Sequence, residues 1–254
     1  YALFSPGRKV VFPDITYSFY PVYTELFGLD YEEIPLNEDF TLPVERFLGG
    51  NGGAVICNPN APTGRALPLS DIRRIVEANP AAAYADFGAQ SAVELIDQYP
   101  NLLVVRTMSK SRSLAGMRIG YALGSQDLID GVNCVKNSFN SYPLDRLAQA
   151  AGEAAVRDTA YFEETRGKIM ATRTWVTHRL REMGFQVHDS SSNFLFIAHP
   201  DHSGRVLQQG LRDRGVLVRR FERPRIQDHL RVSIGTDEEM EAMCRAMEEI
   251  LKGQ

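Results

Sequence analysis

The chain has 254 residues, of which 44% are hydrophobic and 24% are charged, the balance of an ordinary globular protein. Its formal net charge of −4 provides no long-range attraction to nucleic acid or to an anionic membrane. No apolar run approaches the roughly 20 residues that span a bilayer, and no signal peptide opens the chain. Three widely spaced cysteines predict neither a disulfide framework nor a zinc site, so we expect a cytoplasmic protein without a metal.

The first half of the chain alternates short apolar runs with helical patterns. It begins at Tyr1 without an initiator methionine, and we expect an N-terminal segment to precede it. Ser70 is expected to cap a helix that ends near Ala78, since Asp71 favours the positive end of a helix. An earlier helix is expected at 18–27, and strands at Val10–Phe12, Ala54–Cys57, Leu102–Val105 and Met117–Leu123. This alternation predicts an α/β fold with a mostly parallel sheet sandwiched by helices.

The second half has fewer strands, with helices grouped beside them. Helices are expected within 143–183 and at 203–213 and 237–251, and strands at Asn193–Ala198, Gly215–Arg219 and Leu230–Ile234. This grouping predicts a smaller C-terminal α+β domain. We therefore expect a large domain over residues 1–150 and a small domain over 151–254.

Lys110 has the most informative surroundings of any polar residue in the chain. It follows an apolar strand directly, so we expect it at a carboxyl end, where open α/β sheets bind ligands. Thr107 and Ser109 add hydroxyl donors, and Arg118 adds a cationic fork, a mixture that suits a phosphate-bearing ligand. A lysine beside other cations in a desolvated site has a lowered pKa and can attack a carbonyl. The pattern predicts an anion site with a nucleophilic amine, and by itself does not name the ligand.

The segment Asn58-Pro-Asn-Ala-Pro-Thr-Gly64 also follows a strand. Its prolines and glycine predict a rigid turn, stabilised by asparagine side chains. Taken alone it reads as a strand-to-helix loop, although such a loop can also hold the Asn60 amide against a ligand. Tyr17 lies just past the first strand, where it either packs in the core or stacks on a flat ring.

Arg219 and Arg231 both lie on strand-like segments of the second half. An arginine on a strand is usually a surface residue, but one that faces a cleft binds a carboxylate or phosphate through two hydrogen bonds. The sequence leaves both interpretations open. The five histidines show no metal spacing, and we interpret all of them as structural or surface residues.

Taken together, these motifs resemble the fold-type-I aminotransferases that use pyridoxal phosphate (PLP), and most closely the histidinol-phosphate aminotransferases. The resemblance rests on NPNAPTG, YADFG, RTMSKSRSLAGMRIGYA, SSNFLF, GVLVR and LRVSIGT, which occur in the family's order and cover essentially the whole chain. It implies transamination of L-histidinol phosphate with 2-oxoglutarate, in histidine biosynthesis. It also implies a homodimer.

The resemblance implies a role for each matching residue. Lys110 would attach to PLP and move the proton between the substrate and the cofactor. The other cofactor contacts would be Thr107, Ser109 and Arg118 to the phosphate, Tyr17 stacked on the ring, and Tyr84 and Asn60 at the ring oxygen. Arg219 and Arg231 would bind the phosphate of the amino donor and the carboxylate of the 2-oxo acid.

The chain departs from the family pattern at three places. The segment that cups the cofactor phosphate, with the N-terminal arm, would lie before Tyr1. A strand ending in Asp-Glu-Ala-Tyr is expected before Tyr84; here Ala81 takes the place of the aspartate that pairs with the ring nitrogen, and the strand is predicted to be missing. Asp86 is not assigned that role. Ala61 stands where the family has asparagine before Pro-Thr-Gly, which puts Asn60 one position early.

Two alternative functions follow from the same residues. One keeps the fold and changes the reaction, to an aromatic amino-acid aminotransferase or an amino-acid-phosphate decarboxylase. The other is a protein of this fold that binds a ligand or partner without catalysis, which the missing aspartate favours if the chain is truly this short.

Overall fold

The computed structural model describes residues 2–4, 6–49, 52–79, 81–82 and 90–253, with only the backbone of 81–82. It divides into two compact units, the first formed by residues 1–61 and 66–162 and the second by 62–65 and 163–254. The sequence placed a boundary at 150/151, whereas the units divide at 162/163, inside helix α5 (Thr159–Glu182). No helix in the described ranges is long and apolar enough to cross a membrane.

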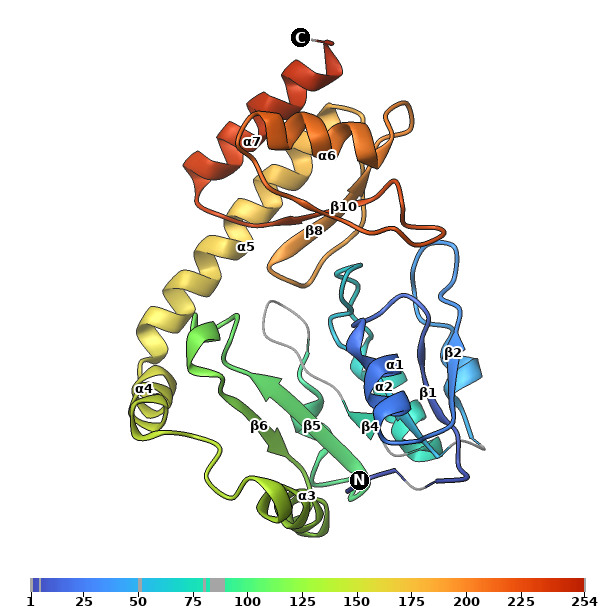
Figure 1. The fold of residues 1–254 in the computed structure, drawn as a ribbon. Helices are drawn as coiled ribbons and strands as arrows, with labels where there is room; N and C mark the ends of the chain where they lie inside the picture. The colour runs from blue at the N-terminus through green and yellow to red at the C-terminus, as the bar shows by residue number, and fades with distance from the viewer. Residues whose placement is uncertain (1, 5, 50–51, 80, 83–89, 254) are drawn as a thin grey trace. The chain divides into compact units, whose positions relative to one another are not determined.

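A six-stranded sheet forms the centre of the first unit (Figure 1). Its strand order is β2-β1-β3-β4-β5-β6, and every neighbouring pair is parallel except β5 with β6. The strands are β1 (Val10–Pro13), β2 (Tyr31–Ile34), β3 (Gly53–Val55), β4 (Ala81–Ala82), β5 (Leu102–Thr107) and β6 (Gly120–Leu123). The expected mostly parallel sheet is therefore confirmed, although β6 begins at Gly120, after a short 3-10 turn at Ala115–Met117 (η3).

The strand that we predicted to be missing is present in the sheet. Ala81 pairs in parallel register with Ala54 of β3 and with Leu102 of β5, so β4 joins the two sides of the sheet. The prediction was wrong because alanine has little intrinsic preference for strands, and a pattern search finds nothing in so short a run. Hydrogen bonds from strands on both sides supply the stabilisation that local propensity does not.

Helices of the first unit are α1 (Phe19–Leu26), α2 (Leu69–Ala78), α3 (Gln126–Phe139) and α4 (Arg146–Arg157). Helix α2 buries Ile72, Ile75 and Val76 in the same apolar cluster as β3 and β5, and it ends at Ala78 as predicted. Its cap is Pro68, and Ser70 is already inside the first turn, so the predicted serine cap was wrong. Extended backbone at Pro68 starts the helix two residues earlier than the serine pattern suggested.

The second unit packs helices α5, α6 (Gly204–Asp213) and α7 (Asp237–Leu251) against an antiparallel sheet (Figure 1). The strand order is β7 (Gln186–Val187), β8 (Phe194–Ala198), β10 (Leu230–Ser233) and β9 (Arg219–Arg220). Alternate residues of β8 and β10 enter the helical core: Leu195, Ile197, Leu230 and Val232. The opposite face of these strands therefore carries a different set of side chains, among them Phe196 and Arg231.

Most elements of this unit match their predictions. Helix α7 spans the predicted 237–251, and Thr236 and Glu239 form a capping box at its start. Strand β9 is the exception, because it comprises Arg219–Arg220 and not the apolar run 215–219.

The capping box allows a stability prediction. Thr236→Ala removes the hydroxyl that accepts the Glu239 N–H, so the free energy of unfolding of this unit should fall by about 1 kcal/mol. Thr236→Ser keeps the acceptor and should cost less. Trp175 is the only tryptophan, and its indole N–H donates to Asp237 Oδ1 at 2.8 Å, so its fluorescence during urea unfolding reports on this helix end. Equal losses in the two variants would contradict the capping role.

Candidate active site

Lys110 lies on a tight turn in the loop that joins β5 to β6. The Met108 N–H donates to the Ile119 carbonyl at 3.0 Å, and the Leu114 N–H donates to the Met108 carbonyl at 3.0 Å. The Ser113 N–H closes the turn on the Lys110 carbonyl, also at 3.0 Å. These backbone bonds fix the loop, and the Lys110 side chain stands exposed on it. The sequence therefore folds into a rigid turn that presents one amine.

The hydroxyl groups predicted to bind phosphate lie together beside that turn. Thr107 Oγ1 donates to Ser109 Oγ at 2.8 Å, and the Ser109 N–H donates to Thr107 Oγ1 at 3.1 Å. Arg118 closes the other end of the same loop with φ 54°, a left-handed conformation that is costly for a residue other than glycine. Its guanidinium is exposed and donates to the Ala115 carbonyl at 2.8 Å. Hydroxyls, a backbone N–H and a guanidinium on one loop suit a phosphate group.

Asn60 ties the loop after β3 to the loop after β1. Its Nδ2 donates to the Ile15 carbonyl at 2.9 Å, and its Oδ1 accepts the Thr16 hydroxyl at 2.8 Å. Asn60 is buried, whereas the adjacent Tyr17 ring is 46% exposed and stacks on Phe19. The amide therefore fixes the backbone that presents Tyr17.

Asn58 ties the start of the NPNAPTG segment to Leu67, just beyond its end, which agrees with the predicted rigid turn. Its Oδ1 accepts the Leu67 N–H at 2.7 Å, and its Nδ2 donates to the Leu67 carbonyl at 3.2 Å. Gly64 has φ +76°, and a Cβ there would lie 2.5 Å from the Ser190 hydroxyl oxygen. The segment therefore tolerates little change in shape.

The sheet topology relates these loops to one another. Strands β1, β3, β4 and β5 are neighbours and run parallel, so their carboxyl ends lie along one edge of the sheet (Figure 1). Tyr17, Asn60 and Lys110 follow three of these ends. This edge is where open α/β sheets bind ligands. Tyr84 and Asp86 lie outside the described residues, and position 81 lies on the central β4.

The second unit places two arginines opposite each other. Arg219 of β9 and Arg231 of β10 are Cα partners, so their side chains share a face of the sheet. Their guanidinium carbons lie 5.6 Å and 5.9 Å from the centre of the same Phe221 ring. Like charges directly opposite each other destabilise a strand pair. A site that holds two guanidinium groups in this way is suited to an anion that binds both.

Two histidines that the sequence analysis read as structural or surface residues form a pair near these arginines. His188 Nε2 and His229 Nε2 are 3.2 Å apart, and the His229 ring stacks on Phe196 at 4.6 Å. Burial, and then the neighbouring His188, lower the pKa of His229 to about 4, so it is neutral at pH 7. No group of three or more metal-ligating side chains occurs in the part of the chain that the structure describes. Only proximity in the fold reveals this pair, because 41 residues separate its members.

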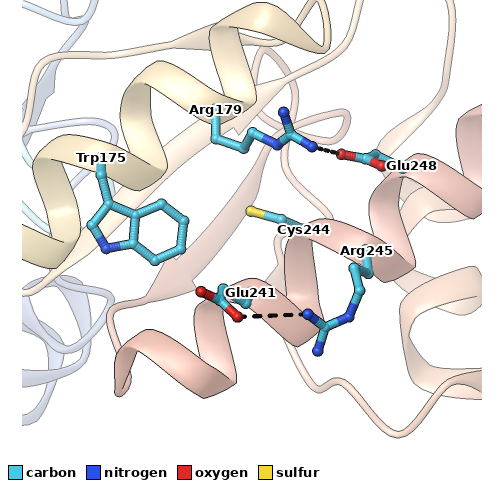
Figure 2. A pocket seen from close by; sticks show the side chains of 6 residues that line it. All are labelled: Trp175, Arg179, Glu241, Cys244, Arg245 and Glu248. Carbon is cyan, nitrogen blue, oxygen red and sulfur yellow. Dashed lines mark hydrogen bonds and ion pairs between the residues drawn. The ribbon is translucent and has the colours of Figure 1, made fainter.

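A separate pocket lies between α5 and α7, and its walls pair their own charges. Figure 2 shows Arg179 bonded to Glu248 and Arg245 paired with Glu241, with Cys244 between the two pairs and Trp175 to one side of them. Burial raises the pKa of the Cys244 thiol to about 11, so the thiol is protonated and not nucleophilic. None of the described residues predicted for the site lines this pocket, and we do not assign it to the active site.

Comparisons with known proteins point to one family. The model of the family described as aminotransferase class I and II matches residues 1–247. A histidinol-phosphate aminotransferase of Burkholderia lata is 52% identical over 98% of this chain and 72% of its own. The histidinol-phosphate aminotransferase structure from Clostridium acetobutylicum has a TM-score of 0.89 and covers 100% of this chain and 80% of its own, at 20% identity. That from Sinorhizobium meliloti, in complex with pyridoxal-5'-phosphate, has a TM-score of 0.82 and covers 98% and 72%, at 22% identity. These two structures show the fold.

The Asn60 tie allows a prediction about the site. Asn60→Ala leaves the buried Thr16 hydroxyl and Ile15 carbonyl without the amide, so the free energy of unfolding should fall by about 1–3 kcal/mol. PLP affinity, measured by absorbance titration, should fall with it, because the Tyr17 loop loses its anchor. Thr16→Val removes only one of the two bonds and should have a smaller effect on both.

Thr236→Ala serves as the control, since it destabilises the other unit without touching this loop. Unchanged PLP affinity in Asn60→Ala would contradict the anchoring role.

Proposed function

The chain belongs to the class I and II aminotransferase family, and we propose that it transfers the amino group of L-histidinol phosphate to 2-oxoglutarate with PLP as its cofactor. The observation that carries the choice of substrate is the arginine pair of the second unit, which suits a doubly charged phosphate. High identity to histidinol-phosphate aminotransferases over nearly the whole chain supports the same substrate. We further propose that the protein is a cytoplasmic homodimer, as the family resemblance implies.

The residues of the first unit suit the phosphate group and the ring of the cofactor. Thr107, Ser109 and Arg118 would hold its phosphate, since their donors share one rigid loop with Lys110. Tyr17 would stack on its ring, and the family resemblance implies a hydrogen bond from Asn60 and from Tyr84 to the ring oxygen. PLP supplies the electron sink that makes the bond at the substrate α-carbon labile. The protein contributes orientation and a proton carrier.

Lys110 is the proton carrier in this proposal. Its Nζ would hold the cofactor and, with the substrate bound, would accept the proton from the substrate α-carbon. The backbone bonds of the 108–119 loop fix the point from which the Lys110 side chain extends, which helps to position the amine for proton transfer. A flexible loop would give up this advantage.

Arg219 and Arg231 bind the substrate's anionic end in each half-reaction. The amino donor brings a phosphate and 2-oxoglutarate brings a second carboxylate, and a guanidinium fork can bond two oxygens of either group. One arginine pair can therefore serve both substrates. An amino-acid-phosphate decarboxylase or an aromatic aminotransferase would need a different orientation or a different anion, and no described side chain favours either.

Ala81 bears on the non-catalytic alternative. In the family pattern an aspartate at this position keeps the ring nitrogen protonated, and here the central strand β4 carries alanine. A chain with this alanine can still hold the cofactor through Lys110 and the phosphate loop. Its turnover is expected to be slow, because the electron sink is weaker without the acid.

Substitution at this position tests that expectation. Ala81→Asp should raise turnover by at least about tenfold, since electrostatic groups placed at developing charge contribute effects of this size or more. Ala81→Asn, which matches the aspartate in shape and lacks its charge, should not. Single-turnover kinetics with L-histidinol phosphate would measure both. An Ala81→Asp variant no faster than Ala81→Asn would favour the binding protein without catalysis.

Substitution of each arginine by lysine tests the pair, because lysine keeps the positive charge but lacks the two-pronged guanidinium group. Arg219→Lys and Arg231→Lys should each raise KM for L-histidinol phosphate about tenfold or more, with a smaller effect on L-histidinol, which lacks the phosphate. Arg245→Lys, in the separate pocket of Figure 2, is the matched control and should change neither. Equal effects on the two donors would show that the pair does not bind the phosphate.

A further inference from the structure

We infer that His188 and His229 form a hydrogen-bonded support that positions the Arg219–Arg231 pair for the anionic end of the substrate. The inference rests on the proposed function and extends it to residues that do not themselves touch the substrate. The two histidines act on the arginines through Phe196 and Phe221. All of these contacts lie within the second unit.

The first link holds Phe196 from two sides. The His188 backbone N–H donates to the Phe196 carbonyl at 3.1 Å, which fixes the strand at this residue. The His229 ring lies on the Phe196 ring at 4.6 Å with an interplanar angle of 15°. His188 and His229 also contact each other, with ring centres 5.3 Å apart and Nε2 atoms 3.2 Å apart. Phe196, which is fully buried, is therefore clamped through its backbone and its ring.

The second link leads from Phe196 to the arginines. Phe196 is the Cα partner of Arg231 across β8 and β10, and its ring meets Phe221 edge-on at 6.4 Å. Both guanidinium groups lie over Phe221. A shift of Phe196 would therefore move both the strand partner of Arg231 and the ring on which the two arginines rest. His229 also stands directly before β10, so its position sets where that strand begins.

The chemistry of imidazole explains why a histidine pair suits this place. Two apolar side chains would pack equally well but would leave the ring orientation to packing alone. A hydrogen bond between the Nε2 atoms, with one ring donating and the other accepting, fixes both rings and their tautomers. Because the pKa of His229 is about 4, the ring that stacks on Phe196 adds no positive charge next to the two guanidinium groups at pH 7. A lysine or a protonated histidine here would repel the arginines that it supports.

Substitution of His188 separates this role from simple packing. In the PLP-loaded protein, His188→Leu should raise KM for L-histidinol phosphate and Kd for inorganic phosphate about tenfold, with kcat within about twofold. His188→Gln keeps a side-chain donor and acceptor and should restore most of the affinity. His202→Gln is the control: His202 contacts another histidine, His199, at 4.8 Å, and its loss should change nothing.

Phosphate binding by the His188 and Arg231 variants separates the positioning role of the histidines from the proposed function. If His188→Leu matches the wild type while Arg231→Lys weakens phosphate binding, the positioning role is wrong and the proposed function stands. If neither variant changes phosphate affinity, the arginine pair is not the anion site and both fail. Equal losses in His188→Leu and His188→Gln would also overturn the hydrogen-bonded support.

A measurement on the unaltered protein covers the case in which His188→Leu does not fold. With nitrogen-15-labelled histidine, saturating inorganic phosphate should shift the imidazole resonances of His188 and His229 and leave those of His202 in place. Resonances of the pair that do not move would overturn the inference.

Discussion

The parallel pairing of β1, β3, β4 and β5 is the constraint on which the first unit depends. Each strand contributes only a few residues, and β4 contributes two. The pairing nevertheless brings the loops after β1, β3 and β5 to one edge of the sheet, and those loops carry Tyr17, Asn60 and Lys110. Without β4, the strands that precede Asn60 and Lys110 would not belong to one sheet. The two alanines therefore matter through their backbone hydrogen bonds.

The second unit depends on a different physical balance. One face of its sheet packs against the helical core, and the other face holds two like charges opposite each other. The rings of Phe194 and Phe221 give those charges cation–π contact, and the His188–His229 pair packs on Phe196, the strand partner of Arg231. An arrangement of this kind costs stability in the free protein and is compensated when an anion binds. The same balance would allow one site to bind a phosphate or a carboxylate, as we propose.

Much of the fold could be predicted from the sequence because its longer elements follow hydrophobic periodicity. Helix α7 and strand β8 show this, since apolar spacing alone predicted their limits to within one residue. The two-residue strands β4 and β9 could not be predicted, because sheet neighbours and not local propensity create them. Lys110, Thr107 and Ser109 are close in sequence, so their grouping was readable from the motif. The His188–His229 pair and the shared Phe221 ring depend on strand register and become visible only in the fold.

The central claim is that Lys110 is the amine that binds PLP, and covalent trapping tests it most directly. The protein would be incubated with PLP, reduced with borohydride, digested and mapped by mass spectrometry. We predict a single stable pyridoxyl label on the peptide that contains Lys110, and none on the other lysines. A protein that binds PLP but carries no label at Lys110 would contradict the assignment of this loop as the active site.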